Sequence, residues 1–397
     1  MPGLLPRRQH SYRLVSPAVV TLTAVSFIVG TTEFMAVGMV PQIAENLRAP
    51  VGSTGLISSL YATCVAVTTL PVAVALMQRS PRVLLPGGLA VFAGAHAVMA
   101  LAPTLVVLIA GRVIAATIHS LALGSAFCTA SVLAAPKQRG PAVAMVSGGL
   151  AAAMFLGAPL GTALGAVVGW RASFALVGGL GLLVALAVLR TVPRIPDQPS
   201  VDRAALRAAL HPSVAKPLIA ALVIQLANAL MFTYLGAYLA AVTRLDGPGV
   251  AGGLAAFGLA GVLGTFLGGH AAGRHPRRWA TLAGIAMAVS LAAFGFLGTH
   301  LGAAYLLIAI WGMAMQVIMP IVTHQAVESG GNLAAALNSG AANTGIATGG
   351  LAAGALLSLV SLGDLPWIAS GATVLTVLIM KTNSLVNSPA GHQPSPH

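Results

Sequence analysis

Long apolar runs separated by short polar breaks extend along almost the whole chain. A helix needs about 20 mostly apolar residues to cross the hydrocarbon core of a membrane, and most of the runs are of about this length. The breaks at charged, Gly, Pro and turn residues therefore predict twelve membrane-spanning helices, at residues about 17–40, 52–77, 83–102, 105–131, 140–167, 173–191, 215–241, 249–273, 279–298, 301–323, 332–360 and 364–381. Only the stretch 192–214 is polar enough to form a longer loop, and it divides the spans six and six.

Charged residues are scarce, and their scarcity excludes a water-soluble globule. The chain has 397 residues, of which 20 are Lys or Arg and 7 are Asp or Glu, and 57% are hydrophobic. A soluble protein carries roughly a quarter charged residues. We therefore expect an all-α integral membrane protein, embedded in the lipid bilayer and without a separate soluble domain.

The net charge of +13 arises from a shortage of acids rather than from a basic patch. The cations are scattered in ones, twos and threes, which argues against binding of nucleic acid. The two cysteines, Cys64 and Cys128, lie in apolar runs with no Cys or His at metal-ligand spacing. The sequence therefore predicts neither a metal site nor a cofactor.

The distribution of the cations predicts the orientation, because positively charged residues avoid translocated loops. With the N-terminus inside, sixteen cations fall on the inner side, and three, Arg48, Arg171 and Arg244, fall on the outer side. Both termini are therefore predicted to be cytoplasmic. The first apolar run follows a basic start but is too long for a signal peptide and lacks a small-residue cleavage site, so we expect a retained helix.

Two sequence matches indicate an internal repeat. The segment 78–82 (Gln-Arg-Ser-Pro-Arg) resembles the segment 273–277 (Gly-Arg-His-Pro-Arg), 195 positions later. Ser147-Gly148 and Ser339-Gly340 each open a Gly/Ala-rich stretch, at an offset of 192. Chance matching of small residues is the alternative for the second pair. The similar offsets favour two homologous six-helix bundles, at residues 1–191 and 215–397, joined by a cytoplasmic loop at 192–214.

Several motifs occur in an order typical of one transporter family. They are Thr31-Thr32-Glu33-Phe34 with Gly38 and Pro41, Arg112 followed by His119 and Gly124, Gly157-Ala158-Pro159-Leu160-Gly161, Trp170-Arg171, and Leu337-Asn338-Ser339 with Asn343 and Gly345. Together with the two six-helix halves, they resemble the major facilitator superfamily, and more specifically its bacterial drug and sugar efflux proton antiporters. The resemblance implies two pseudo-symmetric bundles of six helices in a bacterial inner membrane.

The basic loops after helices two and eight, with Arg79, Arg82 and Arg274, resemble a conformational motif of the same superfamily. This chain departs from the usual pattern, because Gln78 stands where the motif has Asp and Pro81 where it has Gly. The charge-paired gate that the motif usually forms is therefore not expected here in its usual form.

Glu33 is the acid that lies well inside a predicted span. A charged carboxylate in hydrocarbon costs about 3 kcal/mol or more, and such residues usually face a water-filled cavity or a partner. Thr23, Ser26, Gly30 and Glu33 follow at helical spacing and share one face. We expect this polar stripe to line a cavity and Glu33 to bind the transported proton. The alternative is that Glu33 lies near the outer interface and is merely hydrated.

Arg112 is the single cation inside a predicted span, and a guanidinium cannot lose its charge to escape the membrane. His119 lies seven residues later, on the same helical face. The family resemblance implies that Arg112 belongs to the proton-coupling machinery, and a pair with Glu33 is one hypothesis. The alternative is a structural tie to backbone carbonyls. His119 is expected either to relay protons or to serve as a hydrogen-bonded packing residue.

The series Gly157, Gly161 and Gly165 allows a neighbouring helix to approach closely, and Pro159 removes a backbone donor. Ordinary helix packing is the alternative, and the spacing alone favours it. In the resembled family the motif marks antiporters, so the resemblance favours efflux over uptake.

Uncharged polar and aromatic residues on other predicted helices suggest a substrate cavity. The candidates are Tyr61, Thr68, Gln225, Asn228, Phe232, Gln316, His324, Asn338 and Asn343. Hydrogen-bonding groups among aromatic side chains suit neutral polyols or amphiphilic drugs better than a dianion. Each residue alone is equally compatible with a hydrogen bond that joins two helices.

Motifs that the sequence lacks argue against two other classes of membrane protein, ATP-driven pumps and membrane enzymes. The three lysines follow Pro136, Ala215 and Met380, so the sequence has no Gly-Lys-Ser or Gly-Lys-Thr phosphate loop of an ATP-driven pump. One embedded acid does not make the paired acids of a membrane enzyme. We therefore expect a monomeric secondary transporter, not an enzyme, that exports a small organic solute in exchange for protons. Uptake of a neutral sugar or nucleoside, and a non-transporting receptor or scaffold, are the alternatives.

Overall fold

The computed structural model describes residues 16–76, 80–135, 138–194, 207–208, 211–272 and 274–382. The helices of the N-terminal half are α1 (Pro17–Asn46), α2 (Val51–Leu76), α3 (Pro81–Ala100), α4 (Leu105–Leu133), α5 (Arg139–Ala152), the π-helical turn η2 (Ala153–Gly157), α6 (Ala158–Val168) and α7 (Trp170–Thr191). Those of the C-terminal half are α9 (Pro212–Phe232), α10 (Leu235–Ala241), α11 (Gly247–Ala272), α12 (Pro276–Leu297), α13 (Leu301–Leu356), the 3₁₀ turn η3 (Leu362–Asp364) and α14 (Leu365–Thr382).

Several helices begin at a proline, whose missing N–H costs nothing in the first turn. Pro17, Pro81, Pro212 and Pro276 each stand at the first position of their helix. At α1 the preceding residue adds a cap, because the Ser16 hydroxyl accepts a hydrogen bond from the Val19 amide at 3.3 Å. The predicted starts of these helices are therefore right to within a few residues.

The twelve predicted spans all correspond to helix. The fifth is α5 and α6 joined through η2, and the seventh is α9 continued by α10. The tenth and eleventh spans form the single long α13, which breaks where Gly330 and Gly331 leave helical geometry. Gly331 has a φ of 72°, a left-handed conformation that glycine adopts without steric cost.

Among the described residues, eleven helices are long and apolar enough to cross a membrane. The second part of α13, residues 332–356, is helical but carries Asn332, Asn338 and Asn343. Large apolar side chains cover the outside of the molecule, and Phe266 and Phe296 are 75% and 74% exposed. Such exposure is unfavourable in water and normal where a helix faces lipid.

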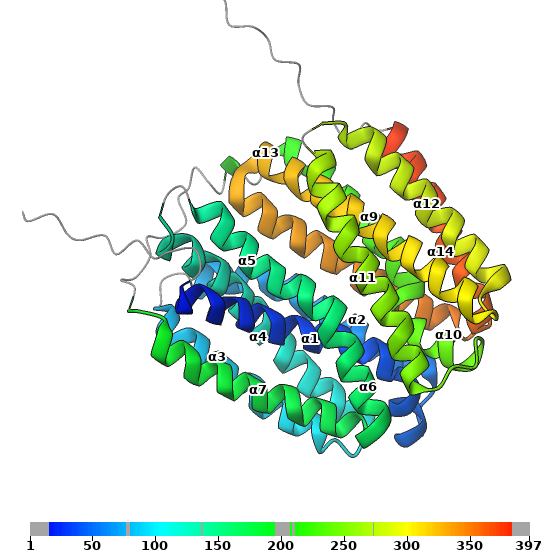
Figure 1. The fold of residues 1–397 in the computed structure, drawn as a ribbon, viewed down its shortest axis with the longest axis horizontal. Coiled ribbons are helices and arrows are strands. Elements are labelled where there is room, and N and C mark those ends of the chain that lie inside the picture. The colour runs from blue at the N-terminus through cyan, green and yellow to red at the C-terminus, as the bar shows by residue number, and fades with distance from the viewer. Residues whose placement is uncertain are drawn as a thin grey trace, which may run out of the picture.

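The buried apolar side chains form two main clusters, one in each half of the chain. The first is formed almost entirely by residues 18–192, and the second by residues 220–380 together with Val37. Figure 1 shows α3, α4 and α7 gathered on one side and α9, α12 and α14 on the other. The predicted boundary loop, 192–214, falls largely outside the described residues.

The loops after α1 and α10 share an unusual backbone geometry. Arg48 and Arg244 are the two described non-glycine residues with positive φ, at 51° and 61°. They follow the ends of α1 and α10 by two and three residues and are 196 positions apart, close to the offsets of the two sequence matches. This agreement supports the internal repeat.

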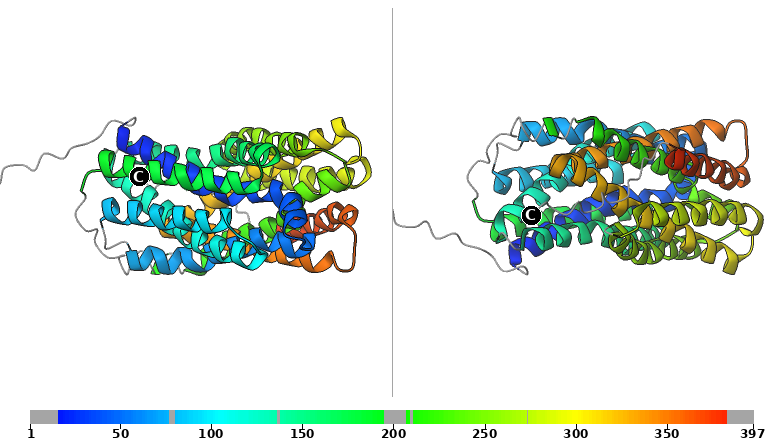
Figure 2. Two further views of the ribbon diagram at one scale, coloured as in Figure 1. Left: turned by 90° about the horizontal axis from the view of Figure 1, so that it is seen from below. Right: turned by 90° about the horizontal axis from the view of Figure 1, so that it is seen from above.

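The two halves meet closely at the end of the molecule that holds these loops, here called the sealed end. The Tyr234 hydroxyl donates to the Gly52 carbonyl at 2.9 Å, and the Cα of Gly236 lies against the Val37 carbonyl. Toward the opposite end, a cavity of about 410 Å³ separates α2 from α13, between Ala66 and Gly340. In both views of Figure 2 the helices run roughly horizontally, so the sealed end and the opposite end lie at the two sides of the picture.

Glycines bring α5 and α6 into close contact with α1. A Cβ at Gly149 would collide with the Thr23 carbonyl, one at Gly157 with the Thr31 side chain, and one at Gly161 would touch Met35. These three glycines therefore follow one face of α1 along its length. The π-helical turn directly before Pro159 accommodates the residue that lacks a backbone donor.

The glycine contact with α1 is tested by a neighbouring pair of substitutions. Gly149→Ala places a methyl group against the Thr23 carbonyl, so it is expected to destabilise the folded protein by about 1–3 kcal/mol. Gly148→Ala is the matched control, because no atom lies within 4 Å of its added Cβ. Thermal unfolding of the purified protein in detergent measures both. Equal stability of the two variants would contradict the close contact.

Candidate functional site

Glu33 lies near the middle of α1, as the seventeenth of its 30 residues. At 1.5 Å per residue this is about 20 Å from the end of the helix at Asn46. The side chain is 13% exposed. The alternative that Glu33 sits at the outer interface does not fit this depth.

A histidine on α4 lies beside the Glu33 carboxylate. His119 Nε2 lies 3.8 Å from Glu33 Oε2, and the His119 side chain is 3% exposed. On its other side, His119 Nδ1 lies 3.0 Å from the hydroxyl of Tyr61 on α2. The ring is thus fixed between a carboxylate and a phenol, so residues from three helices meet at this point.

Arg112 is the fourth residue at this point, and its guanidinium lies over one face of the Tyr61 ring. Its guanidinium carbon lies 4.1 Å from the centre of the Tyr61 ring, and the whole side chain is buried. Nε donates to the Ile57 carbonyl at 3.1 Å and Nη1 to the Thr32 carbonyl at 2.6 Å. The structure therefore has the structural tie to backbone carbonyls, and the direct ion pair of Arg112 with Glu33 is not formed.

One nitrogen of Arg112 remains without a partner. Nη2 is buried and makes no hydrogen bond to the described residues. A buried unpaired donor of a charged group is costly, and a water molecule or a rearranged neighbour would satisfy it. We call Glu33, Tyr61, Arg112 and His119 the charged cluster.

A second group of predicted residues comes together in the C-terminal half. The Asn228 amide donates to the Gln225 side-chain oxygen at 3.3 Å, and Phe232 lies on the same helix, α9. Gln316, on α13, reaches across to the N-terminal half, with its amide nitrogen 3.1 Å from the Met154 sulfur. Gln225, Phe232 and Gln316 are partly exposed, whereas Asn228 is 7% exposed.

Two aromatic residues outside the predicted substrate set also belong to this second group. The Trp311 indole N–H donates to the Asn228 side-chain oxygen at 3.0 Å. Phe257 packs edge-on against Trp311, with ring centres 5.0 Å apart, and lies 4.7 Å from the Phe232 ring. We call Gln225, Asn228, Phe232, Phe257, Trp311 and Gln316 the aromatic-amide cluster. The sequence does contain a signal for Trp311, because a tryptophan inside a predicted span needs a hydrogen-bond partner for its indole N–H.

The other predicted substrate residues lie apart from both clusters or are used in packing. The Thr68 hydroxyl donates to its own helix and lies 3.0 Å from the Ser120 hydroxyl, which joins α2 to α4. His324 is 48% exposed and lies 3.5 Å from the Glu328 carboxylate. Asn338 donates to Thr323 at 3.1 Å, across the break in α13, and Asn343 donates to the Ser339 carbonyl in its own helix.

The arginines of the two basic loops have different surroundings. Arg82 donates to the Leu189 carbonyl at 2.8 Å and so ties α3 to α7. Arg274 lies 2.7 Å from His270 in the preceding turn. Arg79 lies outside the described residues. Neither of these contacts involves a carboxylate, which agrees with the missing Asp at position 78.

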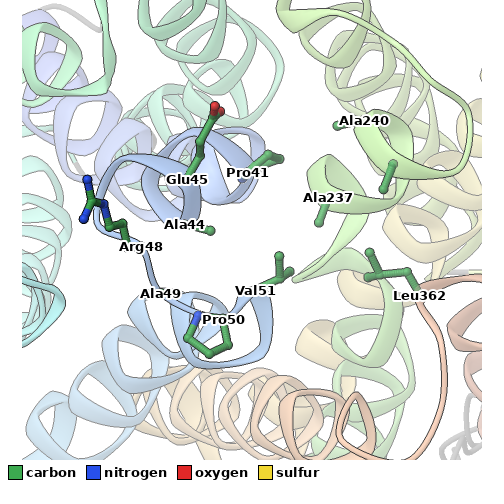
Figure 3. Close-up of a pocket in the computed structure, with 11 residues that line it drawn as sticks. Pro41, Ala44, Glu45, Arg48, Ala49, Pro50, Val51, Ala237, Ala240 and Leu362 are labelled. Atoms are coloured by element: carbon green, nitrogen blue, oxygen red, sulfur yellow. The ribbon is translucent and has the colours of Figure 1, made fainter.

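A separate pocket of about 560 Å³ lies at the sealed end, between the halves. Figure 3 shows it between the ends of α1 and α2 and the residues of α10, with Glu45 and Arg48 on its rim. Its other lining residues are apolar or proline, among them Ala237 and Leu362. Glu45 is twelve residues beyond Glu33 along α1, so this pocket is about 18 Å from the charged cluster.

The two clusters differ in the chemistry that they allow. The charged cluster contains one carboxylate with a histidine and a phenol beside it, a set suited to binding and passing a proton. The aromatic-amide cluster offers ring faces and carboxamides. In the described C-terminal half the charged side chains lie at helix ends, so this cluster is suited to an uncharged ligand.

Comparisons with known proteins agree with this architecture. A sequence model of the Major Facilitator Superfamily matches residues 22–354. The uncharacterised MFS-type transporter YfhI of Bacillus subtilis (strain 168) is 27% identical over 372 residues, which covers 92% of this chain and 93% of that protein.

Two solved structures have the same fold. Both are of a bacterial homologue of the human lysosomal transporter Spinster, one inward-facing and occupied and the other inward-facing and unoccupied. Their TM-scores are 0.72 and 0.71, at 16% and 18% identity, and each comparison covers 98% of this chain and 100% of the other. At this identity the likeness concerns the fold alone.

The charged cluster predicts a graded effect of two changes at Tyr61. Tyr61→Phe removes the hydroxyl beside His119 but keeps the ring, so we expect a loss of about 1–3 kcal/mol of stability. Tyr61→Leu also removes the ring from the guanidinium of Arg112 and is expected to cost about 2 kcal/mol more. Thermal unfolding in detergent measures the difference. Equal losses would show that the ring contact with Arg112 does not stabilise the fold.

Proposed function

Since the chain belongs to the Major Facilitator Superfamily, a family of membrane transporters, we propose that it exports a small uncharged organic solute in exchange for protons. Glu33 carries the proton, and the aromatic-amide cluster contributes to the solute site. The observation that carries this proposal is a carboxylate at mid-depth in the described part of the chain, 3.8 Å from a histidine and without a direct ion pair to the buried arginine, which bonds to backbone carbonyls instead.

The exchange requires that proton and solute occupy the protein in turn. When the site faces outward, Glu33 takes up a proton as the solute leaves. When the site faces inward, solute binding favours release of that proton to the cytoplasm. Two halves that alternate between two arrangements provide the necessary access, as is typical of transporters built from repeats.

The arrangement of the halves supports an inward-facing state. The contacts of Tyr234 with Gly52 and of Gly236 with Val37 close the end that the positive-inside rule predicts to be outside. The cavity between Ala66 and Gly340 lies toward the predicted cytoplasmic end. In this reading the chain is a monomer in the bacterial inner membrane, with both termini in the cytoplasm.

The solute class follows from the aromatic-amide cluster. Trp311 donates to Asn228, and Asn228 donates to Gln225, so the free N–H groups of Gln225 remain for a ligand. Partly exposed Phe232 provides an apolar surface beside them. Neutral sugars, polyols and amphiphilic drugs with hydroxyl or carbonyl groups match such a surface, whereas a dianion would require cations.

Transport into or out of liposomes with an imposed pH gradient tests the proposal. The purified protein is reconstituted, and radiolabelled neutral sugars and amphiphilic drugs are screened for movement opposite to the proton gradient. Movement in the same direction as protons would support symport instead. A gradient-independent result for every solute that moves would contradict proton coupling.

Glu33→Gln is expected to abolish accumulation driven by the pH gradient, because the amide cannot exchange a proton. Exchange of labelled for unlabelled solute should continue, since the amide resembles the protonated carboxyl. Glu45→Gln is the matched control on the same helix, because Glu45 is exposed near its end. Unchanged gradient-driven export by Glu33→Gln would remove the proposed role.

Gln225→Ala is expected to raise the KM of the identified solute about tenfold, since it removes the side-chain N–H groups proposed to hydrogen-bond the solute and leaves the solute's acceptor unpaired. Proton coupling should persist because the charged cluster is intact. Thr348→Ala is the control, because that hydroxyl bonds only to its own helix. A KM unchanged by Gln225→Ala would place the solute elsewhere.

A further inference from the structure

His96 is a buried histidine that the proposed proton exchange does not use. It lies on α3, is 0% exposed, and its ring lies 4.0 Å from that of Phe92 and 6.1 Å from that of Phe174, centre to centre. On α7, a Cβ at Gly178 would approach the His96 Cβ to 2.7 Å. The ring is thus enclosed by two helices and has a fixed position.

Both ring nitrogens of His96 are engaged. Nδ1 lies 2.8 Å from the Phe92 carbonyl, which only accepts, so Nδ1 carries the hydrogen. In the neutral ring Nε2 is then an acceptor, and the Thr32 hydroxyl donates to it at 2.6 Å. The histidine therefore joins α3 to α1 at one defined residue.

Thr32, the residue before Glu33 on α1, is held from two sides. Its hydroxyl is bound by His96, and its carbonyl accepts the hydrogen bond from Arg112 at 2.6 Å. The next residue is Glu33. The segment that carries the carboxylate is therefore fixed to α3 through the side chain of Thr32 and to α4 through its backbone.

We propose that His96 is a positioning residue for the charged cluster: through Thr32 it keeps Arg112 on its backbone carbonyls, so that Glu33 faces His119 and stays free of the guanidinium. The inference rests on the proposed function only in treating Glu33 as the proton site. Without the Thr32 anchor, the segment of α1 around Thr32 loses its bond to α3 and can shift locally against α4. Arg112, which already has one unpaired nitrogen, then pairs with Glu33.

The neighbouring threonine provides a matched comparison. The Thr31 hydroxyl donates only to the Phe27 carbonyl of its own helix, at 2.8 Å. Thr31→Val and Thr32→Val therefore make the same small change at adjacent buried positions, but only the second removes a bond between helices. Thr32→Ser retains the hydroxyl, and His96→Phe removes the same bond from the other side while keeping an aromatic ring against Phe92.

The test is covalent labelling of Glu33 by dicyclohexylcarbodiimide, measured by mass spectrometry of the full-length protein in detergent at pH 6.5. The reagent adds to a protonated carboxyl and does not react with a carboxylate held in an ion pair. We expect labelling of the wild type, Thr31→Val and Thr32→Ser at similar rates. Thr32→Val and His96→Phe should label about tenfold more slowly, the effect of about 1.4 kcal/mol.

The outcomes separate this inference from its alternatives. Equal labelling of Thr31→Val and Thr32→Val, whether fast or slow, would overturn it, because His96 would then be a packing residue only. Absence of labelling in the wild type would also overturn it, since Glu33 would already be paired. If the wild type fails to move any solute against protons while the labelling contrast holds, the proposed function is wrong and the positioning role of His96 stands.

Discussion

The N-terminal half is organised by the need to hold one permanent positive charge within the membrane-spanning region. The guanidinium of Arg112 cannot be neutralised by deprotonation, so its environment must satisfy it. Backbone carbonyls of α1 and α2 accept hydrogen bonds from two of its nitrogens, and the ring of Tyr61 lies against its face, whereas Nη2 has no partner among the described residues. The result is a tie between α1, α2 and α4 that leaves the nearby carboxylate of Glu33 without a permanent cationic partner.

Close packing of glycine against α1 reinforces the same region from the opposite side. Gly149, Gly157 and Gly161 lie against α1 at three heights along it, so the helix that carries Glu33 is confined between α4 and the α5–α6 pair. The C-terminal half is different in character, because its central side chains are amides and aromatic rings. We interpret this contrast as a division between a half that handles protons and a half that recognises an uncharged solute.

The helices and their order were predictable from the sequence because apolar run length is a strong signal. The depth of Glu33 and Arg112 followed from the same pattern. Two features were not predictable. The sequence does not specify whether Arg112 turns to Glu33 or to the Ile57 and Thr32 carbonyls, because both are within reach of a long side chain. His96 and Trp311 escaped selection because their roles depend on neighbours from other helices, which spacing along one helix does not reveal.

In the proposed exchange, binding of solute and binding of a proton to Glu33 exclude each other. The most direct measurement is the number of protons released when the identified solute is added to the purified protein in lightly buffered detergent at neutral pH. We expect the wild type to release up to about one proton per bound solute, and Glu33→Gln to release none although the solute still binds. Solute binding by the wild type without any proton release, or release that persists in Glu33→Gln, would contradict it.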